Sequence, residues 1–156
     1  MRPLYHWRTS RPHEYTHSAL NAIGDDDARC DDGPGHGAPP RNVRLGPDEH
    51  LLDHLGGGFD LLLCTPGQAV ADDVLKEVQA QRLRGVPLRV VAVGASAPVA
   101  GADLSLADPD GALRARWGLQ THGNAYLLRP DQHVCARWLT LDATRLRAAL
   151  DAALPR

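Results

Sequence analysis

Lysine and aromatic residues are scarce in this 156-residue chain, and the balance of charge limits what it can bind. Lys76 is the one lysine, and acidic side chains outnumber basic ones slightly, which gives a formal net charge of -2 at pH 7. A protein that binds nucleic acid or an anionic membrane surface usually carries a basic patch. We therefore expect neither of these partners.

Long apolar runs and paired cysteines are also missing. No run approaches the roughly 18 residues that a membrane helix needs, and the first eight residues lack the apolar core of a signal peptide. The three cysteines, Cys30, Cys64 and Cys135, are odd in number and far apart, which fits reduced thiols better than a disulfide framework. These absences predict a soluble, cytoplasmic protein without a membrane partner.

The composition of the chain changes near residue 44. Residues 1–44 have few aliphatic side chains, aspartates at 25–27 and 31–32, and a Gly/Pro cluster over 33–40. Such a segment buries too little apolar surface to offset the entropy lost when its backbone is ordered. We expect an N-terminal arm or linker over 1–44, ordered only against another surface, and a folded domain over 45–156.

The pattern of the domain predicts alternating short helices and strands. Apolar runs bounded by turn residues predict strands over 59–64, 87–93, 124–129 and 133–138. Helices are expected over 47–55, from 65–67 to Gly85, over 112–117, and after Asp142, which is a suitable N-cap.

The order of these elements predicts the fold. A helix joins the first two strands, so we expect them to be parallel. A tight turn at 130–132 joins the last two, which should be antiparallel. A mixed four-stranded sheet with helices on both faces is the thioredoxin architecture. The sequence therefore predicts an α/β, thioredoxin-like domain preceded by an extended N-terminal arm.

Redox chemistry in this architecture occurs where the first strand meets the next helix, because the helix dipole stabilises a thiolate there. That position holds C-T-P-G at 64–67, without a second cysteine, and 121–124 lack the proline that usually precedes the third strand. A dithiol cycle is therefore not expected. Cys64 is either a thiol that packs as a small apolar side chain or the single reactive thiol of a peroxidase. The second interpretation requires a lowered pKa and an arginine close by. Cys135, inside a strand, is expected to pack.

Histidines and glycines suggest two further kinds of site. His50 and His54 are four residues apart, so a helix would place them on one face, a spacing that can begin a zinc site. Further ligands are not evident nearby, and a solvated helix face is the preferred interpretation. The glycines at 56–58 precede a strand, whereas a dinucleotide-binding loop follows one. We therefore expect no catalytic, metal-binding or cofactor-binding residues in this chain.

Three stretches carry a family resemblance. They are R-W-G at 116–118 followed by G-N-A-Y-L-L-R-P-D-Q-H-V at 123–134, L-L-D-H-L-G-G-G-F-D-L-L at 51–62, and Y-T-H-S at 15–18. Together they resemble the carboxyl-terminal domain of FAD-dependent aromatic-ring hydroxylases, in the branch that contains phenol hydroxylase and 3-(3-hydroxyphenyl)propionate hydroxylase. The family commonly shows P-G-x-R-x-P-H before this domain, whereas here Gly37 replaces the arginine and Pro40 the histidine.

The resemblance implies a redox-inactive domain that serves packing and subunit association, in an enzyme that hydroxylates an aromatic ring with FAD and NAD(P)H. The implied partner is the flavin-binding portion of a hydroxylase or a second copy of the chain in a homodimer. Arg129 and Asp131 are expected to hold the hairpin turn. Trp138 either packs in the core, which is preferred, or binds a partner. The alternatives are a stand-alone peroxidase that uses Cys64 and a small module that binds another protein through residues 1–44.

Overall fold

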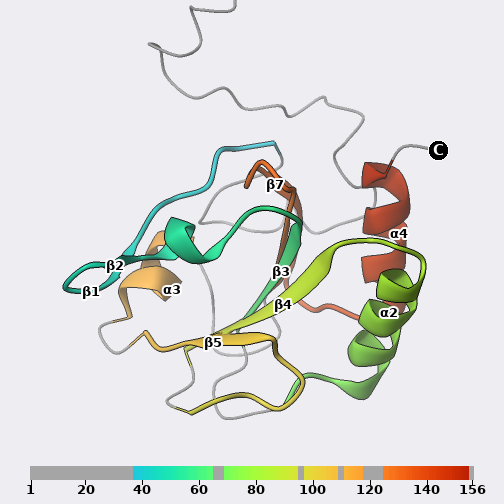
Figure 1. Ribbon diagram of the computed structural model, residues 1–156, viewed down its shortest axis with the longest axis horizontal. Coiled ribbons are helices and arrows are strands. Elements are labelled where there is room, and N and C mark those ends of the chain that lie inside the picture. The colour runs from blue at the N-terminus through green and yellow to red at the C-terminus, as the bar shows by residue number, and fades with distance from the viewer. Residues whose placement is uncertain (1–36, 65–68, 95–96, 109–110, 118–124, 155–156) are drawn as a thin grey trace, which may run out of the picture.

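The computed structural model describes residues 37–64, 69–94, 97–108, 111–117 and 125–154 (Figure 1). The elements in these ranges are, in chain order, β1 (Arg44–Gly46), β2 (Glu49–His50), the 3-10 helix η2 (Leu51–His54), β3 (Phe59–Cys64), α2 (Asp72–Leu83), β4 (Leu88–Val93), β5 (Leu104–Leu106), α3 (Ala112–Trp117), β6 (Ala125–Leu128), β7 (Val134–Trp138) and α4 (Ala143–Ala153).

Five of these strands form one mixed sheet in the order β5-β4-β3-β6-β7. β3 and β4 are parallel and β6 and β7 are antiparallel, so both predicted pairings are confirmed. β6 also pairs antiparallel with β3, which joins the two predicted pairs into one sheet. The predicted count of four strands is wrong, because β5 adds a fifth strand parallel to β4. β5 is the tripeptide L-S-L, which is too short for an apolar run to indicate a strand.

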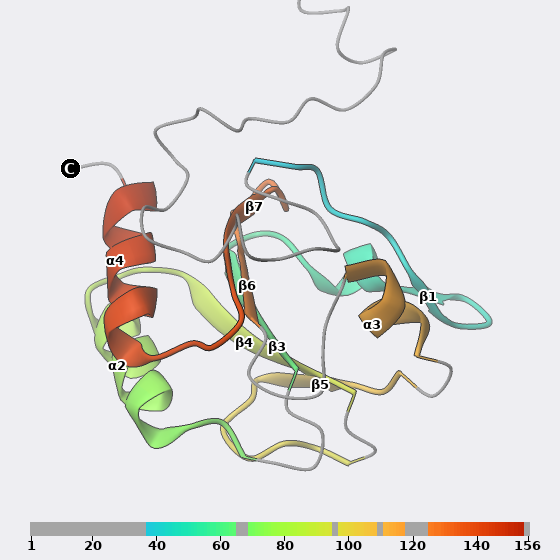
Figure 2. The ribbon, with the colours of Figure 1, turned by 180° about the vertical axis from the view of Figure 1, so that it is seen from behind.

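Different elements cover the two faces of this sheet, as Figures 1 and 2 show. α2 and α4 lie side by side on one face, over a cluster of buried side chains that includes Leu61 and Leu146. α3, η2 and the β1–β2 hairpin cover the other face, over a second cluster that includes Leu62 and Leu113. Successive residues of a strand point to opposite faces, so the consecutive leucines of β3 contribute to both clusters.

The helix predicted over 47–55 is wrong in its first half. β1 and β2 form a separate two-stranded antiparallel hairpin with Pro47 and Asp48 in its turn, and only Leu51–His54 is helical. Proline and aspartate are favoured in turns, because proline presets φ and aspartate bonds nearby backbone groups. The carboxylate of Asp53 accepts a 3.3 Å hydrogen bond from the His50 N–H, which helps to cap the single helical turn.

Aspartates begin the last two helices. The carboxylate of Asp142 accepts a 2.8 Å hydrogen bond from the N–H of Arg145, so the predicted cap of α4 is confirmed. The two carboxylate oxygens of Asp108 accept from the N–H groups of Leu113 and Arg114, each at 3.0 Å, at the start of α3. These bonds occupy N–H groups that have no partner inside the helix.

Several predictions concern residues that the structure does not describe. Residues 1–36, 65–68 and 118–124 lie outside the described ranges, so the division of the chain at residue 44 stays a prediction. The same holds for the stretches at 15–18, 65–67 and 121–124. Among the helices that the structure describes, none is long and apolar enough to span a membrane.

Candidate functional site

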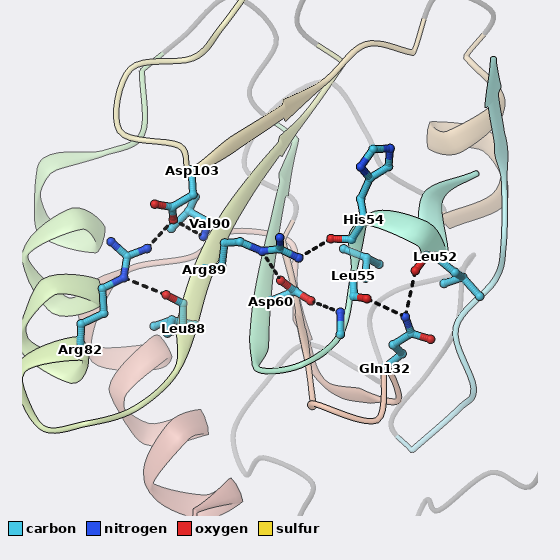
Figure 3. Close-up of polar contacts among 11 residues, drawn as sticks. Leu52, His54, Leu55, Asp60, Arg82, Leu88, Arg89, Val90, Asp103 and Gln132 are labelled. Atoms are coloured by element: carbon cyan, nitrogen blue, oxygen red, sulfur yellow. Dashed lines mark hydrogen bonds and ion pairs between the residues drawn. The ribbon is translucent and has the colours of Figure 1, made fainter. Parts of the chain in front are cut away.

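Two of the stretches that carry the family resemblance meet at the end of the sheet where β3 begins (Figure 3). The side-chain amide of Gln132, in the turn between β6 and β7, donates hydrogen bonds to the carbonyls of Leu52 (3.1 Å) and Leu55 (3.0 Å). These bonds join the hairpin turn to the segment that leads into β3. We call this contact region the motif junction. It consists of Leu52, His54, Leu55, Gly56, Asp60, Arg89 and Gln132.

A buried carboxylate lies at the centre of the motif junction. Asp60, in β3, is 1% exposed. Its oxygens accept from the N–H of Gly56 at 2.8 Å and from Nε of Arg89 at 2.9 Å. Arg89, from β4, also donates to the carbonyl of His54. A buried charge is costly unless it is paired and hydrogen-bonded. The Asp60–Arg89 pair meets this condition and thereby connects β3, β4 and the segment before β3.

The backbone of Gln132 has an unusual conformation. Its φ is 70°, in the left-handed region that residues other than glycine rarely adopt. A Cβ atom at Gly56 would lie 3.3 Å from the amide nitrogen of Gln132, so the glycine leaves room for this side chain. Gln132 escaped prediction, because a glutamine in a turn does not indicate positive φ. The resemblance motif R-P-D-Q was the one available signal.

Arg129 and Asp131 form an ion pair in the same turn. Nε and Nη2 of Arg129 donate to the two carboxylate oxygens of Asp131 at 3.1 and 2.8 Å, and the N–H of His133 adds a 3.1 Å bond. Partial burial raises the pKa of Asp131, but the hydrogen bonds from Arg129 and His133 and their charges outweigh it and hold the pKa below its ordinary value. A contact of either residue with a partner stays a prediction.

Trp138 packs inside the domain. Its side chain is 2% exposed and belongs to the cluster beneath α2 and α4. This position favours the core-packing interpretation over the interface interpretation.

Both cysteines that the structure describes are fully buried, at 0% exposure, in different clusters on opposite faces of the sheet. Burial raises the pKa of the Cys64 thiol. The positive charge of Arg114 lowers that pKa by less, and the negative charge of Asp108 raises it further. A peroxidatic thiol reacts as the thiolate and requires a lowered pKa. The environment of Cys64 therefore opposes the peroxidase interpretation, although an arginine is close by.

The two histidines that suggested a zinc site each lie beside a carboxylate. Nδ1 of His50 is 3.9 Å from Asp53, and Nε2 of His54 is 3.4 Å from Glu49. Within the described ranges, no group of three or more His, Cys, Asp or Glu side chains is placed to hold a metal ion.

No protein-family model and no curated protein matches the chain. Solved flavoprotein structures do. Aklavinone-11 hydroxylase, in a ternary complex with FAD and aklavinone, is 30% identical with a TM-score of 0.55, and the match covers 86% of this chain and 25% of that one. The rebeccamycin biosynthetic enzyme RebC with reduced flavin is 23% identical, with a TM-score of 0.57 and coverage of 90% and 23%. The flavin-dependent monooxygenase PieE, in complex with FAD and substrate, is 22% identical, with a TM-score of 0.60 and coverage of 90% and 24%.

The chain thus spans less than two thirds of each of these proteins, namely 23–25% of their length. The match supports the resemblance that the sequence stretches indicated. This chain has the fold of a portion of the FAD-dependent aromatic hydroxylases, consistent with their carboxyl-terminal domain.

Proposed function

We propose that this chain is a redox-inactive, thioredoxin-like domain of an FAD-dependent aromatic-ring monooxygenase. In this proposal it serves packing and subunit association rather than catalysis. The observation that carries the proposal is the match between 86% of this chain and one quarter of aklavinone-11 hydroxylase, at 30% identity. FAD and NAD(P)H are then bound by the remainder of the parent enzyme.

The topology of the sheet supports a thioredoxin-like assignment. Four of its five strands have the order β4-β3-β6-β7, with one parallel and two antiparallel pairings. α2 and α4 on one face and α3 on the other complete the layered arrangement that the sequence predicted. β5 is an addition at the edge of this unit.

The buried carboxylates among the described residues support a non-catalytic role, because each is hydrogen-bonded inside the fold. Asp60 pairs with Arg89, Glu77 pairs with Arg147, and Asp108 caps α3. The Cys64 thiol has a raised pKa, which opposes thiolate chemistry at neutral pH. A general base or a nucleophile usually has a pKa tuned toward the working pH. The pKa of Cys64 is raised and that of Glu77 is lowered, so both move away from neutrality.

The proposal also assigns a partner and a location. The domain associates with the flavin-binding portion of a hydroxylase or with a second copy of itself, as a homodimer. Cysteines that are buried and widely separated suit a reducing compartment, so the proposed location is the cytoplasm.

The test is a flavin titration combined with a mass measurement on the same sample. The full chain is purified, its absorption spectrum is recorded with and without added FAD, and its molar mass is measured by light scattering after size exclusion. We expect no stoichiometric flavin and the mass of a dimer. Stoichiometric FAD binding would overturn the assignment of the cofactor to the rest of the enzyme. A monomer at every concentration would overturn the homodimer and leave the flavin-binding portion as the partner.

A further inference from the structure

Seven residues before β1 cross the domain from β7 to the β1–β2 hairpin, on the side of the sheet covered by η2 and α3 (Figures 1 and 2). We call residues 37–43 the strap. It lies within residues 1–44, which were predicted to form the arm, and it begins inside the Gly/Pro cluster at 33–40. Its hydrogen bonds reach β7 and α3, which are far from it in the sequence, and η2, which follows about ten residues later.

The amino-terminal end of the strap pairs with the edge strand β7. The N–H of Gly37 donates to the carbonyl of Val134 at 2.8 Å, and the N–H of Val134 donates to the carbonyl of Ala38 at 3.0 Å. Pro39 and Pro40 follow, and proline has no N–H to continue a strand ladder. The pairing therefore ends after Ala38, and the strap leaves the edge of the sheet.

The middle of the strap contacts the end of α3. The carbonyl of Arg41 accepts a 2.8 Å hydrogen bond from the indole N–H of Trp117, and the guanidinium of Arg41 donates to the carbonyl of Arg116 at 2.9 Å. Trp117 is 0% exposed, and a buried indole N–H needs an acceptor. The strap supplies that acceptor.

The carboxyl-terminal end of the strap is hydrogen-bonded to η2. The side-chain oxygen of Asn42 accepts from the N–H of Leu52 at 3.1 Å, and the carbonyl of Val43 accepts from the N–H of Leu51 at 2.8 Å. These two N–H groups belong to the first turn of η2, where a helix has no internal acceptors. Val43 itself is 5% exposed and packs in the cluster beneath α3.

We propose that the strap is an anchoring segment. The surface formed by β7, α3 and η2 recognises it as an extended peptide and thereby fixes, at Gly37, the point where the preceding polypeptide joins the domain. The prolines at 39 and 40 restrict φ before folding, which lowers the entropy lost when the strap is ordered. The inference goes beyond the proposed function, because it holds whatever polypeptide precedes the strap. It also includes residues 37–43 in the folded unit, together with the domain predicted over 45–156.

An anchoring segment has a property that a set of independent contacts lacks, since it opens and closes as one unit. Hydrogen exchange of single backbone N–H groups, measured by NMR on the full chain, tests this. Trp117→Phe removes the indole N–H that bonds Arg41 and keeps a large aromatic side chain in place. We expect the N–H of Val134, at the other end of the strap, to exchange about three- to tenfold faster, in line with the net contribution of one hydrogen bond.

The β3 amides serve as the internal reference, and Gln79→Ala, an exposed amide on α2, as the matched control with no expected change. Faster exchange confined to the neighbours of Trp117, with Val134 unchanged, would overturn the proposal. If Trp117→Phe also accelerates exchange of the β3 N–H groups, the variant destabilises the whole domain. The test of the strap then uses Asn42→Ala. Asn42 is exposed, and its loss should accelerate Leu52 and Val134 without affecting β3. An unchanged Val134 in that variant would equally overturn the proposal.

Discussion

Buried polar side chains determine how the segments of this domain are joined. Asp60, Glu77 and Asp108 are between 1% and 8% exposed, yet each carboxylate accepts hydrogen bonds from an arginine or from backbone N–H groups. Such partners compensate a carboxylate for the loss of water. Gln132 also joins two segments, although it carries no charge, because its amide donates hydrogen bonds to the carbonyls of Leu52 and Leu55.

Gln132 provides a residue-scale prediction. Gln132→Ala removes both bonds to the Leu52 and Leu55 carbonyls and leaves a residue with a Cβ at positive φ, so we expect the free energy of unfolding to fall by about 1–3 kcal/mol. Gln132→Gly loses the same bonds but relaxes the left-handed backbone, and it should be more stable than the alanine variant by about 1 kcal/mol. Urea unfolding measures both, with Gln79→Ala as the control. Equal stability of the two variants would show that the backbone at 132 is not strained.

At the scale of elements, polar contacts connect α2 and α4 in addition to their apolar packing. The carboxylate of Glu77 in α2 accepts from Nε and Nη2 of Arg147 in α4, at 3.0 and 2.6 Å, and from the amide of Gln81 at 2.7 Å. The carboxylate of Asp73 accepts from the N–H of Ala143, the first residue of α4, at 3.1 Å. The relative position of the two helices therefore depends on acidic residues of α2.

This connection predicts a dependence of stability on pH. The hydrogen bonds from Arg147 lower the pKa of Glu77, and although burial opposes them, the folded pKa lies below its ordinary value. The folded state then binds fewer protons than the unfolded state in that range. The stability contributed by Glu77 is present above the ordinary pKa of about 4.3 and is lost as pH falls through the lower folded value.

We expect the urea midpoint to fall as the pH is lowered from about 5 to 3, and Glu77→Gln to be less stable at neutral pH with a smaller loss on acidification. Asp48→Asn is the control, because Asp48 is exposed in the turn between β1 and β2 and should contribute little. Asp131 also has a lowered pKa, so it too contributes stability that is lost on acidification. The contribution of Glu77 is therefore measured as the difference between Glu77→Gln and the unchanged protein. If the urea midpoint of Glu77→Gln fell with acidification as steeply as that of the unchanged protein, Glu77 would not be a source of the pH dependence.

At the scale of the whole molecule, one sheet supports two cores. Leu146 from α4 belongs to the cluster on one face and Leu113 from α3 to the cluster on the other, and both are 0% exposed. β3 contributes alternate residues to both clusters and is buried along its whole length. Loss of either core should therefore destabilise the same sheet.

Leu113→Ala and Leu146→Ala test whether the domain is a single cooperative unit. Each substitution leaves a cavity in a buried cluster and should lower the free energy of unfolding by about 2–5 kcal/mol. Both variants should keep one unfolding transition when circular dichroism and tryptophan fluorescence are compared. Leu83→Ala, at a position 90% exposed, is the control and should change stability by less than about 0.5 kcal/mol. A separate early transition in Leu113→Ala alone would show that α3 and its cluster unfold independently.

Local sequence patterns were sufficient for most of the elements. The apolar runs of β3, β4, β6 and β7, and the capping aspartate of α4, are signals between neighbouring residues, and the structure confirms them. β5 and the β1–β2 hairpin escaped prediction, because three residues or fewer contain too little pattern to distinguish a strand from a loop.

The sequence by itself determined the α/β class of the domain, the parallel β3–β4 and antiparallel β6–β7 pairings and the family resemblance, because each follows from patterns in short stretches of the chain. The β3–β6 and β4–β5 pairings were decided by the fold. The motif junction and the strap were decided only by the tertiary structure. Gln132 bonds carbonyls 77 and 80 residues away, and the indole of Trp117 bonds a carbonyl 76 residues away. The contribution of a glutamine amide or an indole N–H to stability depends on which acceptor the folded chain places beside it. The identity of a polar side chain does not indicate which distant residue supplies that acceptor.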